Sequence, residues 1–341
     1  MPDMENFIKN LKISNFKSIR EAELECGRVN LFVGKPNVGK SNVLEALSLL
    51  GANYSTSKKF MSEFIRYKTL SNCFFYNDIE KPVLVSSDIG FASLEYKHAS
   101  DTFKYMMNFT NHNGHSVYNM PEIKPNGTVI TKDLQFISPV KNYVFQPKTN
   151  VGSSEKHLFF MPPFGKNLFS IIETNGRLLN AIANFFEEYN LDFVIDPLKR
   201  QLEIQRKIGK VVHKIPYELI ADTLQRMIFY YAAIFSNKDS VILFEEPESH
   251  SFLPYVRDLA YHISQDERNQ YFITTHSPHF LKMIVKEMPK EVAVFITYYE
   301  DYETKCKKLT VDDIEEMIGY GIDIFFNSKY FLDEPESQTI A

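Results

Sequence analysis

The stretch that decides the fold is Gly34-Lys35-Pro36-Asn37-Val38-Gly39-Lys40-Ser41, which matches the pattern G-x-x-x-x-G-K-[ST]. Residues 28–33 before it have the short apolar run of a buried strand, and residues 41–50 after it carry helical periodicity, with Gly51 placed to end the helix. Two glycines let backbone N–H groups approach phosphates, and the helix N-terminus adds its positive dipole end. A glycine-rich turn with a surface lysine is the alternative, but it would not need the flanking strand and helix. The stretch therefore predicts a nucleotide-binding α/β fold.

Each residue of this loop has an expected role in binding ATP with Mg²⁺. Lys40 reaches the terminal phosphates, and Ser41 places a hydroxyl on the metal. The expected nucleotide-binding residues of the loop are Gly34, Lys35, Pro36, Asn37, Val38, Gly39, Lys40, Ser41 and Asn42.

Carboxylates follow a second apolar run, residues 241–244, in the order Glu245-Glu246-Pro247-Glu248. A carboxylate at the C-terminal end of a core strand can hold Mg²⁺ through its water shell. Asp is usual at the first position, and the extra methylene of Glu245 favours a water-mediated metal contact. Glu246 is the expected general base, which accepts a proton from the attacking water. A solvated acidic turn is the alternative for this cluster.

His276 follows the strand expected at residues 271–274, 30 residues after Glu246. That separation allows one helix and one strand, which brings His276 to the same sheet edge. There it can hydrogen-bond the γ-phosphate and respond to its loss. The alternative is a histidine with a purely structural hydrogen bond.

Composition sets limits on the class of protein. The chain has 341 residues, 38 Lys plus Arg against 43 Asp plus Glu, and a formal net charge of −5. Any nucleic-acid contact would therefore come from a local patch. The three cysteines lack CxxC spacing, which excludes a cysteine zinc site and fits a reducing cytoplasm. Because no apolar run approaches the roughly 18 residues of a membrane span and the N-terminus lacks a signal-peptide core, we expect no membrane segment.

The order of expected elements predicts one domain with an insertion. Residues 1–51 and 215–300 form the nucleotide-binding core with a mainly parallel sheet, residues 52–214 form an inserted lobe, β-rich and then helical, and residues 301–341 form a C-terminal helix and tail. The lobe has an antiparallel β part and a polar loop at 146–157. No heptad pattern is sustained, so no long coiled coil is expected. The expected strands are 7–13, 82–86, 91–96, 128–130, 142–145, 202–205 and 292–296, and the expected helices are 62–67, 170–190, 217–235, 254–264 and one after Thr310.

Four motifs in this order, Asn15-Phe16-Lys17-Ser18, GKPNVGKSN, LFEEPESH and ITTHSP, resemble the ABC-type chromosome and repair ATPases, which include the SMC, RecF, Rad50 and OLD groups. The likeness is greatest to the OLD-like AAA-family ATPases without a coiled coil that occur in bacterial anti-phage systems beside a nuclease or toxin. It covers roughly residues 5–50 and 215–300. The resemblance implies a P-loop NTPase of ABC type that uses ATP and Mg²⁺ and forms an ATP-dependent homodimer or higher homo-oligomer.

The resemblance also assigns residues outside the phosphate loop. Lys17 and Ser18 would contact the nucleotide, although Lys17 could equally be a solvated turn residue. A signature segment, Ala221-Asp222-Thr223 in place of the usual S-x-G, would contact the γ-phosphate bound by the other protomer, unless it is an ordinary capped helix start. The D-loop falls at Ser249-His250-Ser251. Gln135 and Gln146 are both candidates for the glutamine of a lid loop.

The favoured function is an ATP-driven dimerisation switch that controls a separate effector, a nuclease or toxin, in DNA repair or anti-phage defence. One alternative is a non-hydrolysing ATP-bound scaffold. The other is an ATPase subunit of a membrane transporter, which the missing Gly-Gly in the signature and the 205 residues between Lys40 and Glu245 disfavour. Only 65 residues follow His276, so we expect no Toprim-type nuclease domain after it.

Overall fold

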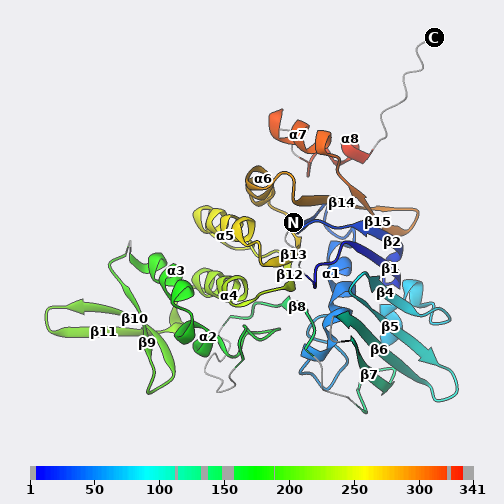
Figure 1. Ribbon diagram of the computed structural model, residues 1–341, viewed down its shortest axis with the longest axis horizontal. Helices are drawn as coiled ribbons and strands as arrows, with labels where there is room; N and C mark the ends of the chain where they lie inside the picture. The colour runs from blue at the N-terminus through cyan, green and yellow to red at the C-terminus, as the bar shows by residue number, and fades with distance from the viewer. Residues whose placement is uncertain are drawn as a thin grey trace, which may run out of the picture.

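A six-stranded core sheet organises the computed structural model, which describes residues 5–111, 114–131, 137–147, 157–187, 189–320 and 324–332 (Figure 1). The strand order is β15-β14-β3-β13-β12-β8, and all neighbours are parallel except β15, which pairs antiparallel with β14. The expected α/β class with a mainly parallel core is confirmed. The strands are β3 (Val29–Val33), β8 (Val140–Tyr143), β12 (Ser240–Glu245), β13 (Asn269–Thr274), β14 (Val292–Glu300) and β15 (Glu303–Lys308).

Alternating residues send side chains to opposite faces of this sheet, and both faces are covered. Leu31, Phe244 and Ile273 belong to the cluster that contains α4, α5 and α6. Phe32 and Leu243 belong to the cluster that contains α1 and a second sheet. The apolar strands therefore lie between two layers, as predicted. The helices are α1 (Lys40–Ser48), α4 (Asp222–Ser236), α5 (Leu253–Gln265) and α6 (Pro278–Glu287).

The second sheet is antiparallel, in the order β2-β1-β4-β5-β6-β7, and it forms the lobe beside α1 (Figure 1). Its edge is the N-terminal hairpin, so one sheet joins a segment expected in the core to strands expected in the insertion. The antiparallel lobe is as predicted, although β6 and β7 were not. The strands are β1 (Asn10–Phe16), β2 (Ile19–Glu25), β4 (Val83–Ser87), β5 (Gly90–Lys97), β6 (Thr102–Asn111) and β7 (Gly114–Ile123).

Helices and a small sheet make up the rest of the insertion. The three-stranded sheet β11-β10-β9 projects from the far end of the molecule (Figure 1). After the core, α7 begins with the capping box predicted at Thr310, in which Thr310 and Asp313 bond each other's backbone N–H groups. The remaining elements are α2 (Leu168–Thr174), α3 (Gly176–Glu187), β9 (Asp192–Asp196), β10 (Gln201–Ile208), β11 (Val211–Pro216), α7 (Val311–Gly319) and α8 (Ser328–Leu332).

Several expected elements are wrong in detail. The helix expected at residues 62–67 is absent: residues 62–64 form a turn and residues 65–67 are irregular, with the Arg66 backbone N–H donating to the Glu45 carboxylate. The strand expected at 142–145 for the lobe is β8 of the core sheet. The sequence did not indicate a core strand here because Lys141 interrupts the apolar run. In the structure Lys141 is buried and donates to Asn237 and Ser240.

Three further expectations need correction. The first helix ends at Ser48, and a 3-10 helix, Leu49–Tyr54, continues through Gly51. The helix expected at 170–190 is two helices, α2 and α3, and residues 128–130 make only isolated bridges. Most of the polar loop at 146–157 lies outside the described residues.

No described helix is longer than the 15 residues of α4, so a long coiled coil is absent from the described part of the chain, as predicted. Within the same ranges, none of the helices combines the length and apolar character needed to cross a membrane.

Candidate nucleotide-binding site

Two glycines allow the phosphate loop to close against the β14–β15 hairpin. Gly34 has φ +145° and Gly39 has φ +97°, in the region that disfavours side chains. A Cβ at Gly34 would lie 2.2 Å from the Thr297 carbonyl oxygen, and a Cβ at Gly39 would lie 2.2 Å from Thr304 Oγ1. Any other residue at either position would force the loop away from the hairpin.

Lys40 starts helix α1 and lies across the loop that precedes it. Its Nζ donates to the carbonyl oxygens of Gly34 at 2.9 Å and Lys35 at 2.7 Å. Burial lowers the Lys40 pKa to about 8, while the charge of Glu246 opposes the shift. Lys35, Pro36 and Asn37 are exposed, so their backbone forms the outer surface of the loop. The geometry suits an anion that replaces the two carbonyls as the partner of the ammonium.

Ser41 and Glu245 meet at the carboxyl edge of the core sheet. Glu245 is the last residue of β12, beside Thr274 of β13, and its Oε1 accepts a 2.5 Å hydrogen bond from Ser41 Oγ. A hydroxyl and a carboxylate side by side at a helix N-terminus fit Mg²⁺, which binds proteins through few oxygen ligands and keeps several waters. This pair of oxygen donors is consistent with the prediction that Ser41 and Glu245 hold Mg²⁺.

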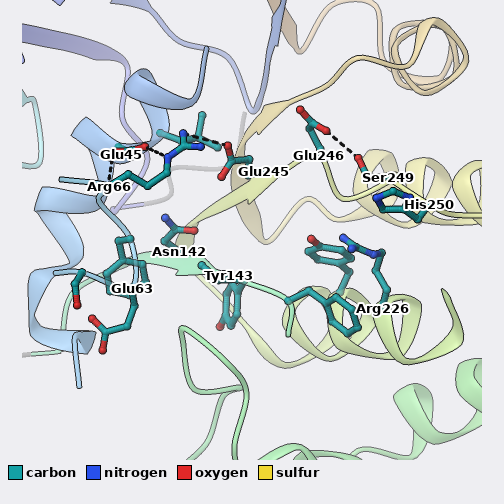
Figure 2. Close-up of a pocket in the computed structure, with 16 residues that line it drawn as sticks. Glu45, Glu63, Arg66, Asn142, Tyr143, Arg226, Glu245, Glu246, Ser249 and His250 are labelled. Carbon is teal, nitrogen blue, oxygen red and sulfur yellow. Dashed lines mark hydrogen bonds and ion pairs between the residues drawn. The ribbon is translucent and has the colours of Figure 1, made fainter. Parts of the chain in front are cut away.

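Glu246 and His276 come together directly behind that pair. The Glu246 backbone N–H donates to the Thr274 carbonyl at 3.0 Å, and its Oε2 accepts from Ser249 Oγ at 2.9 Å (Figure 2). Its Oε1 lies 3.4 Å from His276 Nε2. Glu246 has φ +43°, a conformation that costs on the order of 1–3 kcal/mol in a non-glycine residue and is concentrated at functional sites. Burial, and secondarily the charge of Lys40, lowers the His276 pKa, which favours the neutral ring.

Glu248 is a buried carboxyl to which the sequence assigned no role. Its Oε1 accepts from Thr275 Oγ1 and, at 3.3 Å, from the His276 backbone N–H. Its Oε2 is buried and has no hydrogen-bond partner among the described residues, and burial raises the pKa of the carboxyl. Glu248 therefore fixes the segment that carries His276. The sequence gives no sign of this role, because Glu248 is one of three glutamates that follow the apolar run and nothing in the pattern distinguishes it.

Comparisons with known proteins agree with this geometry. The family model described as "AAA ATPase domain" matches residues 7–216, more than half of the chain. The chain belongs to this family. The match supports the broader resemblance to the SMC, RecF and Rad50 class, whereas the OLD-like assignment stays a prediction.

Two curated proteins resemble shorter parts of this ATPase domain. One is an uncharacterized protein, MJECL10, of Methanocaldococcus jannaschii, 35% identical over 107 residues, which are 28% of this chain and 49% of that protein. The other is the DNA replication and repair protein RecF of Caldanaerobacter subterraneus subsp. tengcongensis, 37% identical over 62 residues, 18% of this chain and 17% of RecF. The chain thus spans about half or less of the length of these relatives.

Solved structures of SMC heads also align with the chain. The SMC head bound to the C-winged helix domain of ScpA is 17% identical, with a TM-score of 0.49, and covers 90% of this chain and 99% of that one. The SMC head domain from Thermotoga maritima is 11% identical, with a TM-score of 0.43, and covers 89% and 99%.

Thr304, a residue that no sequence motif indicated, connects the β1–β2 turn of the ATPase domain to the phosphate loop. Ser18 Oγ accepts from Asn42 Nδ2 at 2.7 Å and lies 2.7 Å from Thr304 Oγ1, which also bonds the Val38 carbonyl at 2.8 Å. Thr304 lies on β15, far from the motif in sequence, so no local pattern could have assigned it. These bonds place Ser18 and Asn42 beside the loop, and their contact with the nucleotide stays a prediction.

A chain of charges runs from the same turn to the predicted metal residue. Lys17 Nζ forms an ion pair with Glu45, which is buried on α1. Arg66 Nε donates to Glu45 at 2.8 Å, and Arg66 Nη2 lies 3.7 Å from Glu245 Oε1 (Figure 2). Lys17 is therefore near the site but paired with Glu45. Neither Glu45 nor Arg66 was expected, because a helical acid and a loop arginine are usually solvated.

Two cavities adjoin these residues. One of about 480 Å³ lies beside Glu245 and Glu246 and extends to His250 (Figure 2). The other, of about 430 Å³, borders Lys17, Ser18 and Asn42. The second cavity is rich in aromatic rings, and its further lining residues are Arg66, Asn72, Phe74, Tyr76, Asn77, Tyr299 and Tyr302.

Two left-handed residues, Tyr76 and Tyr302, and Tyr299 at the end of β14 contribute exposed aromatic rings to the second cavity. Tyr76 has φ +49° and Tyr302 has φ +63°. The Tyr76 hydroxyl donates to the Tyr302 carbonyl at 2.7 Å and lies 3.3 Å from the Tyr299 hydroxyl. All three rings are largely exposed, so they line an open slot next to the first turn of α1.

The signature segment lies at the N-terminus of α4. Ala221 is the N-cap residue, and Thr223 Oγ1 donates to the carbonyl of His250, in the predicted D-loop, at 3.1 Å. Among the described residues, no hydrogen bond or ion pair joins Ala221, Asp222 or Thr223 to the phosphate loop. The described structure therefore links the predicted signature segment to the predicted D-loop, but not to the phosphate site of its own chain.

The two candidate lid glutamines have different positions. Gln146 follows the end of β8 by three residues, at the same sheet edge as Glu245. Gln135 lies outside the described residues.

Proposed function

We propose that residues 1–341 form one ABC-type ATPase domain that binds and hydrolyses ATP and thereby switches between monomer and dimer. The observation that carries the proposal is the meeting of Glu246 and His276, 3.4 Å apart, directly beside the Ser41–Glu245 pair of a phosphate loop. A structural turn would not need a strained carboxylate, a half-exposed histidine and a buried lysine at one sheet edge.

The chain's own residues divide the chemistry between them. Backbone N–H groups of residues 34–42 and the ammonium of Lys40 bind the β- and γ-phosphates. Bound Mg²⁺, held by Ser41 and through water by Glu245, would supply charge neutralisation at the phosphate oxygens. Glu246 accepts a proton from the attacking water, and His276, neutral because its pKa is lowered, donates a hydrogen bond to the γ-phosphate.

The nucleoside is proposed to occupy the aromatic cavity. Asn42 and Ser18 lie between the phosphate loop and this cavity, so a base attached through ribose to the phosphates reaches Tyr76 and Tyr302. Stacking on aromatic rings stabilises a bound base by roughly 1–3 kcal/mol.

Dimerisation would complete the site. Because Ala221 and Asp222 are exposed and unconnected to their own phosphate loop, they are available for the γ-phosphate of a second copy. The Thr223–His250 bond would then couple the signature segment to the D-loop in the same interface. Gln146 is the proposed lid-loop residue, since it extends from β8 at the ATP-binding edge. By resemblance to OLD-like ATPases, we propose that the switch controls a separate nuclease or toxin in anti-phage defence or DNA repair.

A non-hydrolysing, ATP-bound scaffold is the second candidate. It is favoured by Glu245 in place of Asp and by the lost serine hydroxyl and glycine in Ala221-Asp222-Thr223. In that case the chain would bind ATP and a partner without turnover.

Turnover of labelled ATP by the wild type and by Glu246→Gln separates the two candidates. We expect the wild type to release phosphate and Glu246→Gln to do so about 10²-fold more slowly while it still binds ATP. With saturating ATP-Mg²⁺, light scattering should show Glu246→Gln as a dimer.

The matched control is Glu267→Gln, an exposed residue before the amino end of β13 that should leave turnover unchanged. Wild-type ATP binding without turnover would favour the scaffold, and a monomeric Glu246→Gln with saturating ATP would contradict the dimer.

A further inference from the structure

The outer half of the β10–β11 hairpin is exposed on both faces. Every residue from 206 to 216 is exposed, and the hairpin projects from the end of the molecule away from the antiparallel lobe (Figure 1). Apolar side chains share this exposure, with Ile208 54% and Val211 57% accessible. A two-stranded hairpin with no other layer packed against it is only marginally stable in water. This geometry is typical of an element that a ligand covers.

The same segment is strongly cationic in an acidic protein. Residues 204–217 contain no Asp or Glu but include Arg206, Lys207, Lys210 and Lys214, while the whole chain has a net charge of −5. Lys214 is paired with Glu203 at 2.5 Å. Within the described part of the chain, the other three cations form no ion pair.

Protection of the sheet edge accounts for only part of these charges. Lysines on an edge strand prevent unwanted pairing with other chains. Strand β9 pairs with β10 only as far as Gln205, so beyond that residue both strands of the ribbon have a free edge. Edge protection does not require Lys210, which lies in the turn beyond both strands.

The strand register distributes the cations over both faces of the ribbon. Residues directly opposite each other share a face, so Arg206 and His213 lie on one face. Lys207, opposite Val212, lies on the other face, and Lys210 lies in the turn at the tip. A flat acidic protein surface would contact one face only. A groove with phosphates along both walls would contact both faces and the tip.

We propose that the β10–β11 hairpin enters the major groove of duplex DNA. That groove is about 12 Å wide and admits a two-stranded ribbon, whereas the major groove of duplex RNA is too narrow for side chains to read. Arg206, Lys207 and Lys210 would bind phosphates, and Ile208 and Val211 would contact base edges. The element also leads through a 3-10 helix, Tyr217–Leu219, to α4, so bound DNA would be connected to the signature segment. DNA binding itself does not depend on the proposed ATPase.

Fluorescence anisotropy with a labelled duplex of about 30 base pairs, over a salt series, tests the proposal. We expect Arg206→Ala/Lys207→Ala/Lys210→Ala to weaken binding at least about tenfold and to reduce the slope of log K against log salt by roughly 2 to 3. The matched control, Lys282→Ala/Lys286→Ala/Lys290→Ala, removes three exposed lysines of α6 and the turn after it and should stay within about twofold of wild type. Lys210→Gln, confined to the turn, should reduce the slope by about one without disturbing strand pairing.

Several outcomes would overturn the proposal. They are no salt-dependent duplex binding by the wild type, equal weakening in both triple variants, and equal affinity for single-stranded DNA or duplex RNA. Competition by polyglutamate as effective as that by duplex DNA would point to an acidic protein partner instead. ATP binding measured on the same samples shows whether the variants are folded and reports on the ATP site separately.

Discussion

The two ends of the core sheet both carry dense polar clusters, but the clusters differ in kind. At the amino end, Lys141 donates to Asn237 and Ser240, and Asn269 donates to Asp266. These groups are buried and hydrogen-bonded. At the carboxyl end, the site includes exposed groups and a Glu248 oxygen that is buried without a hydrogen-bond partner among the described residues. Left-handed backbone occurs at both ends, with φ +51° at Asp239 and +43° at Glu246, so the difference lies in exposure and hydrogen bonding.

This difference separates structural polar groups from functional ones. A buried polar group with its hydrogen bonds made costs little and fixes the packing. A buried polar group without a hydrogen-bond partner is costly, and such groups often have a catalytic role. A polar cluster in a parallel sheet is therefore not evidence of a site until its hydrogen bonds are counted. The predictions below test the assignment at each end.

The largest effect is expected for Lys40→Ala at the carboxyl end. Its ammonium is the only side-chain cation that the described structure places within hydrogen-bond reach of the loop carbonyls. We expect ATP affinity, measured by isothermal titration calorimetry, to fall by about 10²-fold or more. Lys35→Ala is the control, because the Lys35 side chain is exposed and its expected contribution is through the backbone. A Lys40→Ala dissociation constant within about threefold of wild type would refute the assignment of the loop.

A smaller effect is expected for Tyr302→Ala, which extends the carboxyl-end site to the base. Loss of one stacking ring should weaken ATP binding about tenfold and leave the binding of inorganic triphosphate unchanged. Tyr320→Ala, an exposed tyrosine near the C-terminal helices, is the matched control. Equal losses for ATP and triphosphate would show that Tyr302 acts on the loop rather than on the base.

The carboxyl-end cluster was largely predictable, because its members follow strands in recognisable local motifs. The phosphate loop, Glu245, Glu246 and His276 are each adjacent to the end of an apolar run. Parallel strands then bring those ends together. Thr304 could not be predicted in the same way, since only the antiparallel pairing of β15 with β14 brings it to the loop.

The amino-end cluster was not predictable, and it also misled the assignment of β8. Lys141 looks like a solvent-facing residue because isolated lysines are rarely buried. Its burial depends on Asn237 and Ser240, almost a hundred residues away in sequence. The aromatic cavity was not predictable for the same reason, because Tyr76 of the 3-10 segment Phe75–Asn77 and Tyr302 of the β14–β15 turn are far apart in sequence.

A modest effect is expected for Thr223→Val. This variant tests the proposal that the signature segment acts on the ATP bound by a second copy of the chain. The change removes the hydroxyl that bonds the His250 carbonyl and keeps a similar side-chain volume. We expect ATP turnover to fall about threefold with unchanged ATP affinity in the monomer, and Thr223→Ser to restore it. Steady-state kinetics and binding at low protein concentration measure the two quantities. Weaker ATP binding by the monomer would place Thr223 in its own chain's site.

Lys141→Met, at the amino end, is expected to change the pH dependence of stability rather than ATP binding. Burial lowers the Lys141 pKa to about 7, whereas in the unfolded chain it returns to its ordinary value near 10.5. Between those values the unfolded chain binds more protons, so stability rises with pH through this window and the full cost applies below it. From pH 7 to pH 9 the wild type should gain about 2 kcal/mol relative to Lys141→Met, a shift of a few degrees in melting temperature. Lys238→Met, an exposed neighbour, is the control. If the melting temperatures of wild type and Lys141→Met change in parallel across this pH range, Lys141 stays charged. The amino-end cluster would then contain a buried charge stabilised by its hydrogen bonds and by the Phe159 ring, whose centroid lies 3.7 Å from Nζ.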